Sequence, residues 1–376
     1  MERIFTLRQH IDWILFAAVL PILGAGFLTM NSFTGESEFG SRQVVWIGLS
    51  FVVFFIFSFI DFRFLRRTGV LVALFLASVA SLVFLIFFGH SARGAQSWFN
   101  LGAFSVQPSD PAKIILILIL AKYFSRRHIE IANIRHILVS GFYVLVFFFL
   151  LLLEPDFGSA IIVFLIWLGM VLISGISKKH LIGVFLIAAV VFSGLWFYVF
   201  KDYQKQRIKS FMYPLTDIRG AGYNAYQSTI AVGSGQILGK GIGYGTQSRL
   251  KFLPEYQTDF IFAAFAEEWG FIGVVLLFLL YCILIWRILR IALYGASNFE
   301  TLFAVGVIVL LMSHFLINVG MNIGLMPVTG VVMPFMSYGG SHLLSEFAAL
   351  GILMGMRRYS RQVYRRAAEN EILGIV

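Results

Sequence analysis

The side chains best suited to chemistry in this sequence are carboxylates and basic groups that interrupt long apolar stretches. Asp259 is the clearest candidate, because it stands where a polar segment ends and an apolar stretch begins. A helix dipole favours an ionised carboxylate at the helix N-terminus, whereas partial burial raises the pKa of the same group. Such a carboxylate can serve a chemical function or be only an N-cap or boundary aspartate, with Thr258 as a competing cap. Both interpretations stay open.

A second polar cluster follows Gln107. Ser109 and Asp110 are typical of a helix start, with Pro111 in the first turn. That pattern does not account for Lys113, which lies one turn into an apolar stretch. Lys113 needs a partner, and either Asp110 or a bound anion such as phosphate would serve. The residues alone leave both alternatives open.

Further polar residues interrupt the apolar stretches at other places. Residues 154–158 include Glu154 and Asp156 and are typical of a tight turn between two helices. The Gly- and Pro-rich segment 318–341 contains Ser337, and irregular backbone in a membrane is tolerated only where protein or a water-filled cavity covers it.

Glu267, Glu268 and His314 are further titratable residues inside apolar stretches. Glu267 and Glu268 are candidates for function, or for partners of a buried base. His314 is expected to be a packing histidine.

The elements that must position these residues are membrane helices. The sequence is 59% hydrophobic and 13% charged, whereas soluble domains have roughly 25% charged residues. Continuous apolar runs long enough to cross a bilayer favour helices over barrel strands. We therefore expect an all-α, polytopic integral membrane protein formed as a single domain over residues 1–376. Its predicted spans lie near 13–30, 44–60, 70–89, 111–125, 137–153, 158–175, 180–200, 259–286, 301–325 and 341–356.

Ten crossings place both termini on one side of the membrane. Most basic residues flank the segments on that side, so the positive-inside rule predicts that both termini are cytoplasmic. The same rule explains the net charge of +10 without a nucleic-acid partner. All the polar segments described above then lie at the outer face.

The longest segment without a span is 201–258. Loops of this length are uncommon unless they are functional, and its aromatic residues and glycines predict an ordered outer cap with a short helix at 222–232. Arg207 lies in this cap. The one cysteine, Cys282, excludes an internal disulfide and a cysteine-based metal site.

Together these segments resemble the SEDS family of bacterial cell-wall polymerases, and its elongation branch more than its division branch. The resemblance runs from about Asp12 to Arg358. The matching motifs, in chain order, are Arg93-Gly94-Ala95 with Trp98, Gln107-Pro108-Ser109, Glu154-Pro155-Asp156, Asp202-Tyr203-Gln204 with Arg207, Gly220-Ala221-Gly222-Tyr223, Ile230-Ala231-Val232-Gly233-Ser234-Gly235, Gly245-Thr246-Gln247, Pro254-Glu255 with Thr258-Asp259-Phe260, and Ser337-Tyr338-Gly339-Gly340-Ser341.

The resemblance implies a peptidoglycan glycosyltransferase that polymerises lipid II at the outer face of the bacterial cytoplasmic membrane. Asp259 falls on the family's essential aspartate and Asp110 on a position that is usually Glu. The implied substrate-binding residues are Arg93, Gln107, Ser109, Asp110, Lys113, Glu154, Arg207, Thr258 and Ser337. A divalent cation, Mg or Mn, could assist the diphosphate leaving group, with Asp110 or Glu154 as its ligand.

The resemblance also implies partners, namely a class B penicillin-binding protein that acts as transpeptidase and other membrane proteins of the elongation complex. Small residues allow helices to approach closely, and Gly169, Gly175, Gly183 and Gly194 are candidates for such a contact. Two rival functions are a lipid II transporter, which needs polar groups through the depth of the bilayer, and a non-catalytic scaffold for the transpeptidase.

Overall fold

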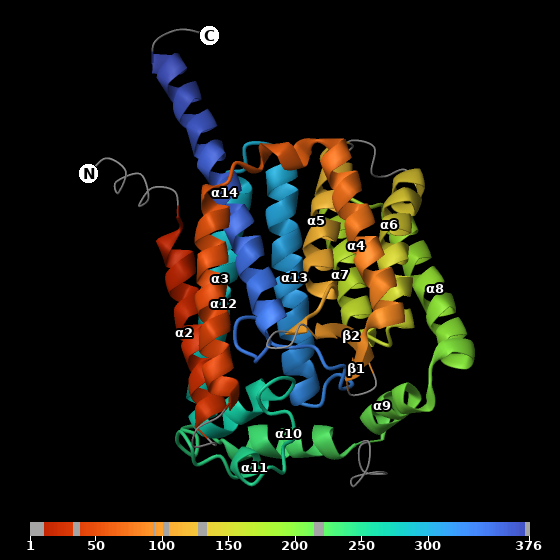
Figure 1. Cartoon of the computed structure of the whole chain (residues 1–376), viewed down its shortest axis with the longest axis vertical. Coiled ribbons are helices and arrows are strands. Elements are labelled where there is room, and N and C mark those ends of the chain that lie inside the picture. The colour runs from red at the N-terminus through yellow and green to blue at the C-terminus, as the bar shows by residue number, and fades with distance from the viewer. Residues whose placement is uncertain are drawn as a thin grey trace.

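The computed structural model describes residues 11–32, 38–92, 95–100, 105–126, 134–213 and 222–372. One long helix lies in each of the ten predicted stretches, and these helices form a bundle (Figure 1). They are α2 (Trp13–Asn31), α3 (Glu38–Phe59), α4 (Thr68–Phe88), α5 (Ser109–Ser125), α6 (Ile134–Leu153), α7 (Phe157–Ile173), α8 (Lys178–Gly194), α12 (Ile261–Leu293), α13 (Asn298–Asn322) and α14 (Gly340–Ile372).

Length and apolarity support an integral membrane protein. Seven of the described helices are long and apolar enough to cross a membrane. Two of the others, α5 and α7, have 17 residues each, which gives about 25 Å of helix against about 30 Å of hydrocarbon. The helix α13 is the most buried candidate span. It packs against α5, α7 and α12.

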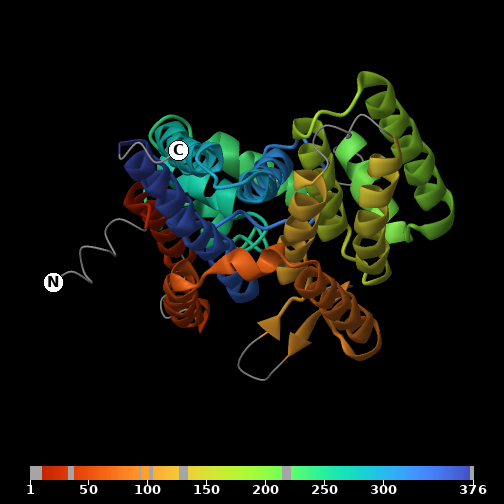
Figure 2. The same ribbon diagram turned by 90° about the horizontal axis from the view of Figure 1, so that it is seen from above.

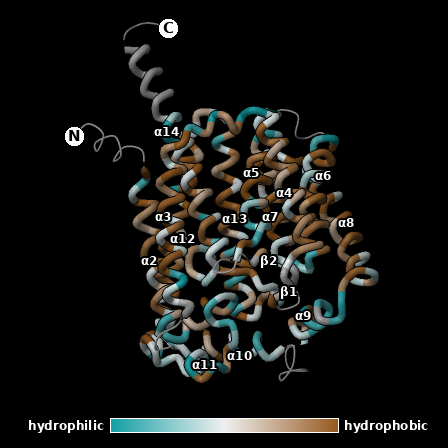
Figure 3. The backbone as a smooth tube through the Cα atoms, viewed as in Figure 1, coloured by the Kyte–Doolittle hydropathy of each residue, from teal (hydrophilic) through white to brown (hydrophobic). Residues whose placement is uncertain are grey.

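The polar elements gather at one end of this bundle, here called the cap end. It holds α9 (Asp202–Met212), α10 (Tyr223–Ser234) and α11 (Thr246–Arg249). Figure 3 shows hydrophilic residues among these elements at the lower end, apolar residues along the helices above them, and further hydrophilic residues at the upper helix ends. The start of α2 and the end of α14 lie at the opposite end (Figure 1). Viewed along the bundle, α6, α7 and α8 lie on the opposite side from α2 and α3 (Figure 2).

The described residues of the predicted cap form helices and turns, and α10 confirms the expected short helix, while residues 214–221 lie outside the described part of the chain. The helices α9 and α11 were not predicted. A small antiparallel sheet was also missed, with β1 (His90–Ala92), β2 (Ala95–Asn100) and β3 (Ser105–Val106) in that order. Its strands are too short for a clear alternation of apolar and polar residues. The π-helical turn η2 (Leu195–Val199) and the 3₁₀ turn η1 (Phe62–Arg66) complete the described elements.

The cap is attached to α12 where that helix is interrupted. Gly270 there has φ 64° and ψ −167°, so the helical hydrogen bonds stop. Loop backbone takes their place. The amide of Gly241 donates to the carbonyl of Glu268 at 3.0 Å, and the amide of Phe271 donates to the carbonyl of Gln236 at 2.8 Å. Exposed peptide groups at a helix break need such partners.

Glu267 and Glu268 secure the same attachment with their side chains. A Glu267 carboxylate oxygen accepts from the Lys240 ammonium at 2.7 Å and from the backbone amide of Gln247 at 3.1 Å. Glu268 accepts from the Gly243 amide at 2.6 Å. The sequence left open whether these acids are functional residues or partners of a base. In the structure, Glu267 pairs with a base, Lys240, and both acids bind backbone amides of the cap.

Glycine is required where the cap crosses α12. Gly239 has φ +82°, and a Cβ there would lie 2.1 Å from the Glu268 carbonyl oxygen. We predict that Gly239→Ala lowers the free energy of unfolding by roughly 2 kcal/mol or more, because both the backbone and the contact must change. Thermal unfolding in detergent and proteolysis of the cap measure the effect.

The matched control is Gly233→Ala, in α10 of the same segment, where a Cβ has no neighbour within 4 Å. Alanine favours a helix by about 1 kcal/mol over glycine, so this variant should be as stable as the native protein or more so. Equal stability of the two variants would contradict the proposed close crossing.

Candidate active site

Asp259 lies at the cap end, in a turn that precedes α12. The N-cap of α12 is Phe260, and Thr258 donates its hydroxyl to Glu255 at 3.1 Å. Asp259 therefore stands at the helix boundary, one residue before the N-cap, and the Thr258 hydroxyl bonds to Glu255. Asp259 is half-buried. A Cβ added to Gly330 would lie 3.6 Å from its Oδ2, so the carboxylate faces a residue without a side chain.

Two asparagines hold the backbone of Asp259. The side-chain amides of Asn318 and Asn322 each donate to the Asp259 carbonyl oxygen at 3.0 Å. Asn318 also donates to the Val331 carbonyl at 2.8 Å. One helical turn separates the two asparagines, so they share a face of α13. Both lie in the segment 318–341 that the sequence marked as irregular, but their role in positioning Asp259 was missed.

A second segment without helix, residues 331–338, packs beside this turn. Ser337 donates its hydroxyl to the Thr258 carbonyl at 2.7 Å and accepts from the Met333 amide at 2.9 Å. The Tyr338 amide donates to the Gln257 carbonyl at 2.8 Å. The structure thus brings together the predicted site residues Asp259, Thr258 and Ser337, and it gives Ser337 backbone partners.

Asp110 and Lys113 lie in the first turns of α5 and form a buried ion pair. The Lys113 ammonium lies 3.2 Å from Asp110 Oδ1, and both side chains are nearly inaccessible. Of the two open alternatives, the structure shows the partner to be Asp110. Ser109 is also buried, and its hydroxyl has no hydrogen-bond partner in the described chain.

The structure adds two residues to this pair that the sequence did not indicate. His342, in the first turn of α14, places Nδ1 3.3 Å from Asp110 Oδ1 and Nε2 2.9 Å from Glu346 Oε1. The latter is an ion-pair contact, because its angles do not suit a hydrogen bond. His314 packs its ring against His342 with centroids 4.7 Å apart, which agrees with a packing histidine.

Gln107 joins three elements of the cap end. Its side-chain amide donates to Asp156 at 2.9 Å, and its backbone amide donates to the Ser341 hydroxyl at 3.1 Å.

Glu154 is only 1% exposed, and neither of its carboxyl oxygens has a hydrogen-bond partner in the described chain. Burial, with a smaller effect from Asp156, raises the pKa of Glu154 to about 8.

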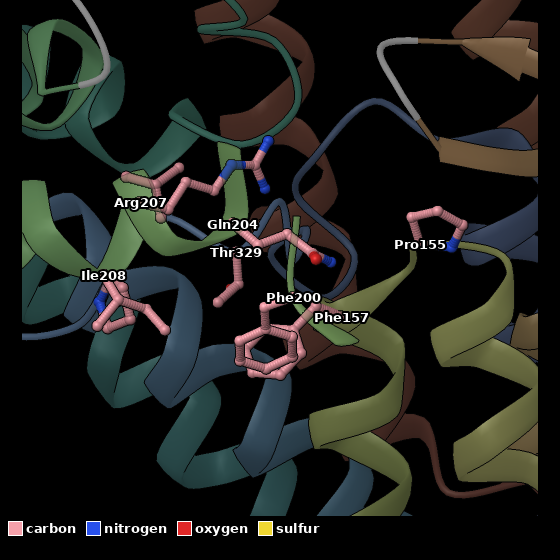
Figure 4. A pocket seen from close by; sticks show the side chains of 9 residues that line it. Pro155, Phe157, Phe200, Gln204, Arg207, Ile208 and Thr329 are labelled. Carbon is pink, nitrogen blue, oxygen red and sulfur yellow. The ribbon is translucent and has the colours of Figure 1, made fainter. Parts of the chain in front are cut away.

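Arg207 lies on a groove at the cap end (Figure 4). Gln204 and Arg207 of α9 provide its polar side, while Phe157 and Phe200 pack edge to face at 5.2 Å on its apolar side. Thr329 completes the wall and precedes Gly330, which lies beside the Asp259 carboxylate. The groove is therefore close to the candidate base. Arg93 lies outside the described residues.

The residues proposed for a divalent cation do not fit a resident metal site. In the described chain, no group of three or more His, Cys, Asp or Glu side chains could hold a metal ion. Asp110 already faces Lys113 and His342. Burial raises the pKa of Glu154 and so disfavours the ionised carboxylate that Mg²⁺ prefers as a ligand.

The raised pKa of Glu154 makes a prediction about stability. The unfolded carboxyl, with a pKa near 4.5, releases its proton at a lower pH than the native one. Stability is therefore lost as the pH rises from about 5 to about 8. We predict that Glu154→Gln removes this loss, which amounts to about 2 kcal/mol between pH 6 and pH 9. Thermal unfolding of both proteins across this range tests it, and parallel curves would contradict it.

Comparison with known proteins identifies the family. The family model described as cell cycle protein, for FtsW, RodA and SpoVE, matches residues 7–362. The peptidoglycan glycosyltransferase MrdB of Escherichia coli strain K12 is 35% identical over 365 residues, 96% of this chain and 97% of that protein. Stage V sporulation protein E of Bacillus subtilis strain 168 is 36% identical over 95% of this chain and 99% of that protein.

Solved structures agree with this result. One chain belongs to a structure of a peptidoglycan synthase complex that coordinates polymerization and crosslinking. It matches with a TM-score of 0.80 and 32% identity, over 93% of this chain and 98% of that one. The rod shape determining protein RodA of Thermus thermophilus matches with a TM-score of 0.70 and 30% identity, over 92% and 96%. The chain therefore belongs to the FtsW, RodA and SpoVE family, the SEDS family that its motifs resemble.

Proposed function

We infer that this chain is a peptidoglycan glycosyltransferase that polymerises lipid II during cell elongation. The observation that carries the inference is a half-buried carboxylate at the polar end of a membrane bundle. Asp259 is held there through its backbone by Asn318 and Asn322, with its side chain facing Gly330. Relatives that match nearly the whole chain are named peptidoglycan glycosyltransferases, which supports the same conclusion.

In the proposed reaction Asp259 acts as general base. It takes the proton from the 4-hydroxyl of one lipid-linked sugar as that oxygen attacks the anomeric carbon of the growing strand. The bond between that carbon and the diphosphate breaks, and the lipid diphosphate leaves with the electron pair. A positioned base contributes about 10²–10⁴-fold to such a step.

The groove is a suitable place for the lipid-linked diphosphate. Its aromatic wall suits the first units of the polyprenyl chain, and the guanidinium of Arg207 suits a phosphate. Arg93 is proposed for the same task from its motif. Lys113 is buried against Asp110, so we assign it an indirect role in which it keeps α5 in place.

A crosslinking partner is part of the proposal. One structurally similar chain comes from a complex that coordinates polymerization and crosslinking, which supports a transpeptidase partner, and we propose a class B penicillin-binding protein. A Cβ added at Gly175, Gly183 or Gly194 would have no neighbour within 4 Å, so these glycines stay candidates for the contact. Gly169 is not one, because it packs against Val309 of α13.

The proposed orientation places the cap end outside the cell and both termini in the cytoplasm. Ion pairs at the opposite end, between Arg287 and Asp12 and between Arg66 and Glu300, agree with the basic residues expected at a cytoplasmic face. The acids and asparagines within the bundle bind cap or loop backbone, which supports an enzyme over a transporter.

The central variant is Asp259→Asn, which keeps the size of the side chain and leaves the backbone carbonyl free to accept from Asn318 and Asn322. We predict that it inserts and unfolds like the native protein but loses polymerisation by at least about 10²-fold, because the base is gone. Gel analysis of glycan strands made from lipid II by purified protein measures this. Polymer at the native rate would remove Asp259 from the mechanism.

Two basic residues should behave differently. Arg207→Ala should raise KM for lipid II by about tenfold with intact stability, because a phosphate contact is lost. Lys209→Ala, on the same helix but outside the groove, is the control.

Lys113→Ala should lower the free energy of unfolding by roughly 3–5 kcal/mol, since Asp110 is left buried without the lysine ammonium.

The double variant Lys113→Met with Asp110→Asn removes both charges. If Lys113 acts only through Asp110, this variant should be more stable than Lys113→Ala and should polymerise lipid II. A stable single Lys113→Ala variant with a raised KM would instead assign Lys113 to the substrate.

A further inference from the structure

A connected set of buried side chains joins α5 and α14 to the segment beside Asp259. Lys113 and Asp110 lie on α5, and His342 and Glu346 lie on the first turns of α14. Glu346 is 4% exposed, and its second oxygen, Oε2, accepts from the Phe335 amide at 2.8 Å. The network therefore ends on backbone of the 331–338 segment.

The charges of this network match in pairs. His342 lies between the carboxylates of Asp110 and Glu346, with one ring nitrogen facing each. A protonated His342 beside Lys113 would give two cations that face two anions in this buried site, which is the pairing that buried charges require.

Phe335 is where the network meets the strained part of the segment. Its φ is +57°, in the left-handed region that residues with a side chain rarely adopt. Such a backbone persists only when its surroundings fix it. The Glu346 carboxylate fixes the Phe335 amide, and His314, packed on His342, places Nδ1 3.2 Å from the Val332 carbonyl oxygen.

The 331–338 segment is hydrogen-bonded to the residues that precede the candidate base, Asp259. Ser337, two residues beyond Phe335, donates to the Thr258 carbonyl at 2.7 Å, and the Tyr338 amide donates to the Gln257 carbonyl at 2.8 Å. Both acceptors immediately precede Asp259. A change in the 331–338 backbone therefore moves the peptide that carries the carboxylate.

We propose that Glu346, together with His342, is a positioning residue for this enzyme: it fixes the 331–338 segment and thereby the Thr258–Asp259 backbone in the catalytic arrangement. The proposal rests on the proposed function of Asp259. Because Glu346 is buried and bonded to backbone, it acts through that backbone and does not touch the substrate.

The test compares Glu346→Ala with Glu346→Gln by lipid II polymerisation kinetics. The alanine variant should lower kcat by about 10- to 100-fold with KM within about threefold, because displacement of a catalytic group affects the reaction more than binding. The glutamine variant keeps a carbonyl acceptor for the Phe335 amide and should recover most of the rate. A native kcat in the alanine variant, an equal loss in both variants, or a loss confined to KM would overturn the proposal.

Glu300→Ala is the matched control for general destabilisation. Glu300 is a buried glutamate at the opposite end, where it accepts from Arg66 and from the Tyr359 hydroxyl, each at 2.6 Å. This variant should unfold at a lower temperature with native kcat per folded molecule. If Glu300→Ala lowers kcat as much as Glu346→Ala does, the effect is not positional and the proposal fails.

Ser337→Ala keeps the test decisive if Glu346→Ala does not fold. This small change removes the link to Thr258 and should give the same loss of kcat with little change of KM. A native kcat for this variant would overturn the proposal. Asp259→Asn is measured beside it: an active Asp259→Asn refutes the proposed function, whereas an inactive Asp259→Asn with a fully active Glu346→Ala refutes only the positioning role.

Discussion

Backbone that is not helical can lie at the end of a membrane bundle only if its peptide groups find partners there. The turn before α12 and the 331–338 segment both face this constraint. Asn318, Asn322, Ser337 and Glu346 supply the partners from α13, from the segment itself and from α14. The groups that satisfy the backbone are thus the groups that hold Asp259.

The cap follows the same rule. The interruption of α12 at Gly270 leaves peptide groups that bind the loop residues 236–243, while Glu267 adds a salt bridge with Lys240. A cap attached in this way covers the cap end without crossing the membrane. The backbone of α12 lies so close to Gly235 and Gly239 that neither position has room for a Cβ. This close contact explains why these two positions are glycine, which the sequence alone suggested only for turns.

Apolarity and length were enough to predict the ten long helices and the location of Asp259 at a helix start, while aromatic residues and glycines predicted the short helix α10 of the cap. The partners were not predictable, because they are distant in sequence: Gln107 meets Ser341 and Asp110 meets His342 only after α5 and α14 pack. A single histidine at the start of an apolar helix carries no local signal. The spacing of Asn318 and Asn322 was such a signal, since it places both on one helical face.

The most direct test of this account is a structure of the protein with a bound, unreactive lipid II analogue that retains the acceptor 4-hydroxyl. The decisive measurement is the distance between that hydroxyl and the nearer carboxylate oxygen of Asp259. The account predicts about 2.6–3.2 Å, with the Asp259 carbonyl still held by Asn318 and Asn322. A hydroxyl bound by another residue, with Asp259 beyond the reach of one bridging water, would contradict it.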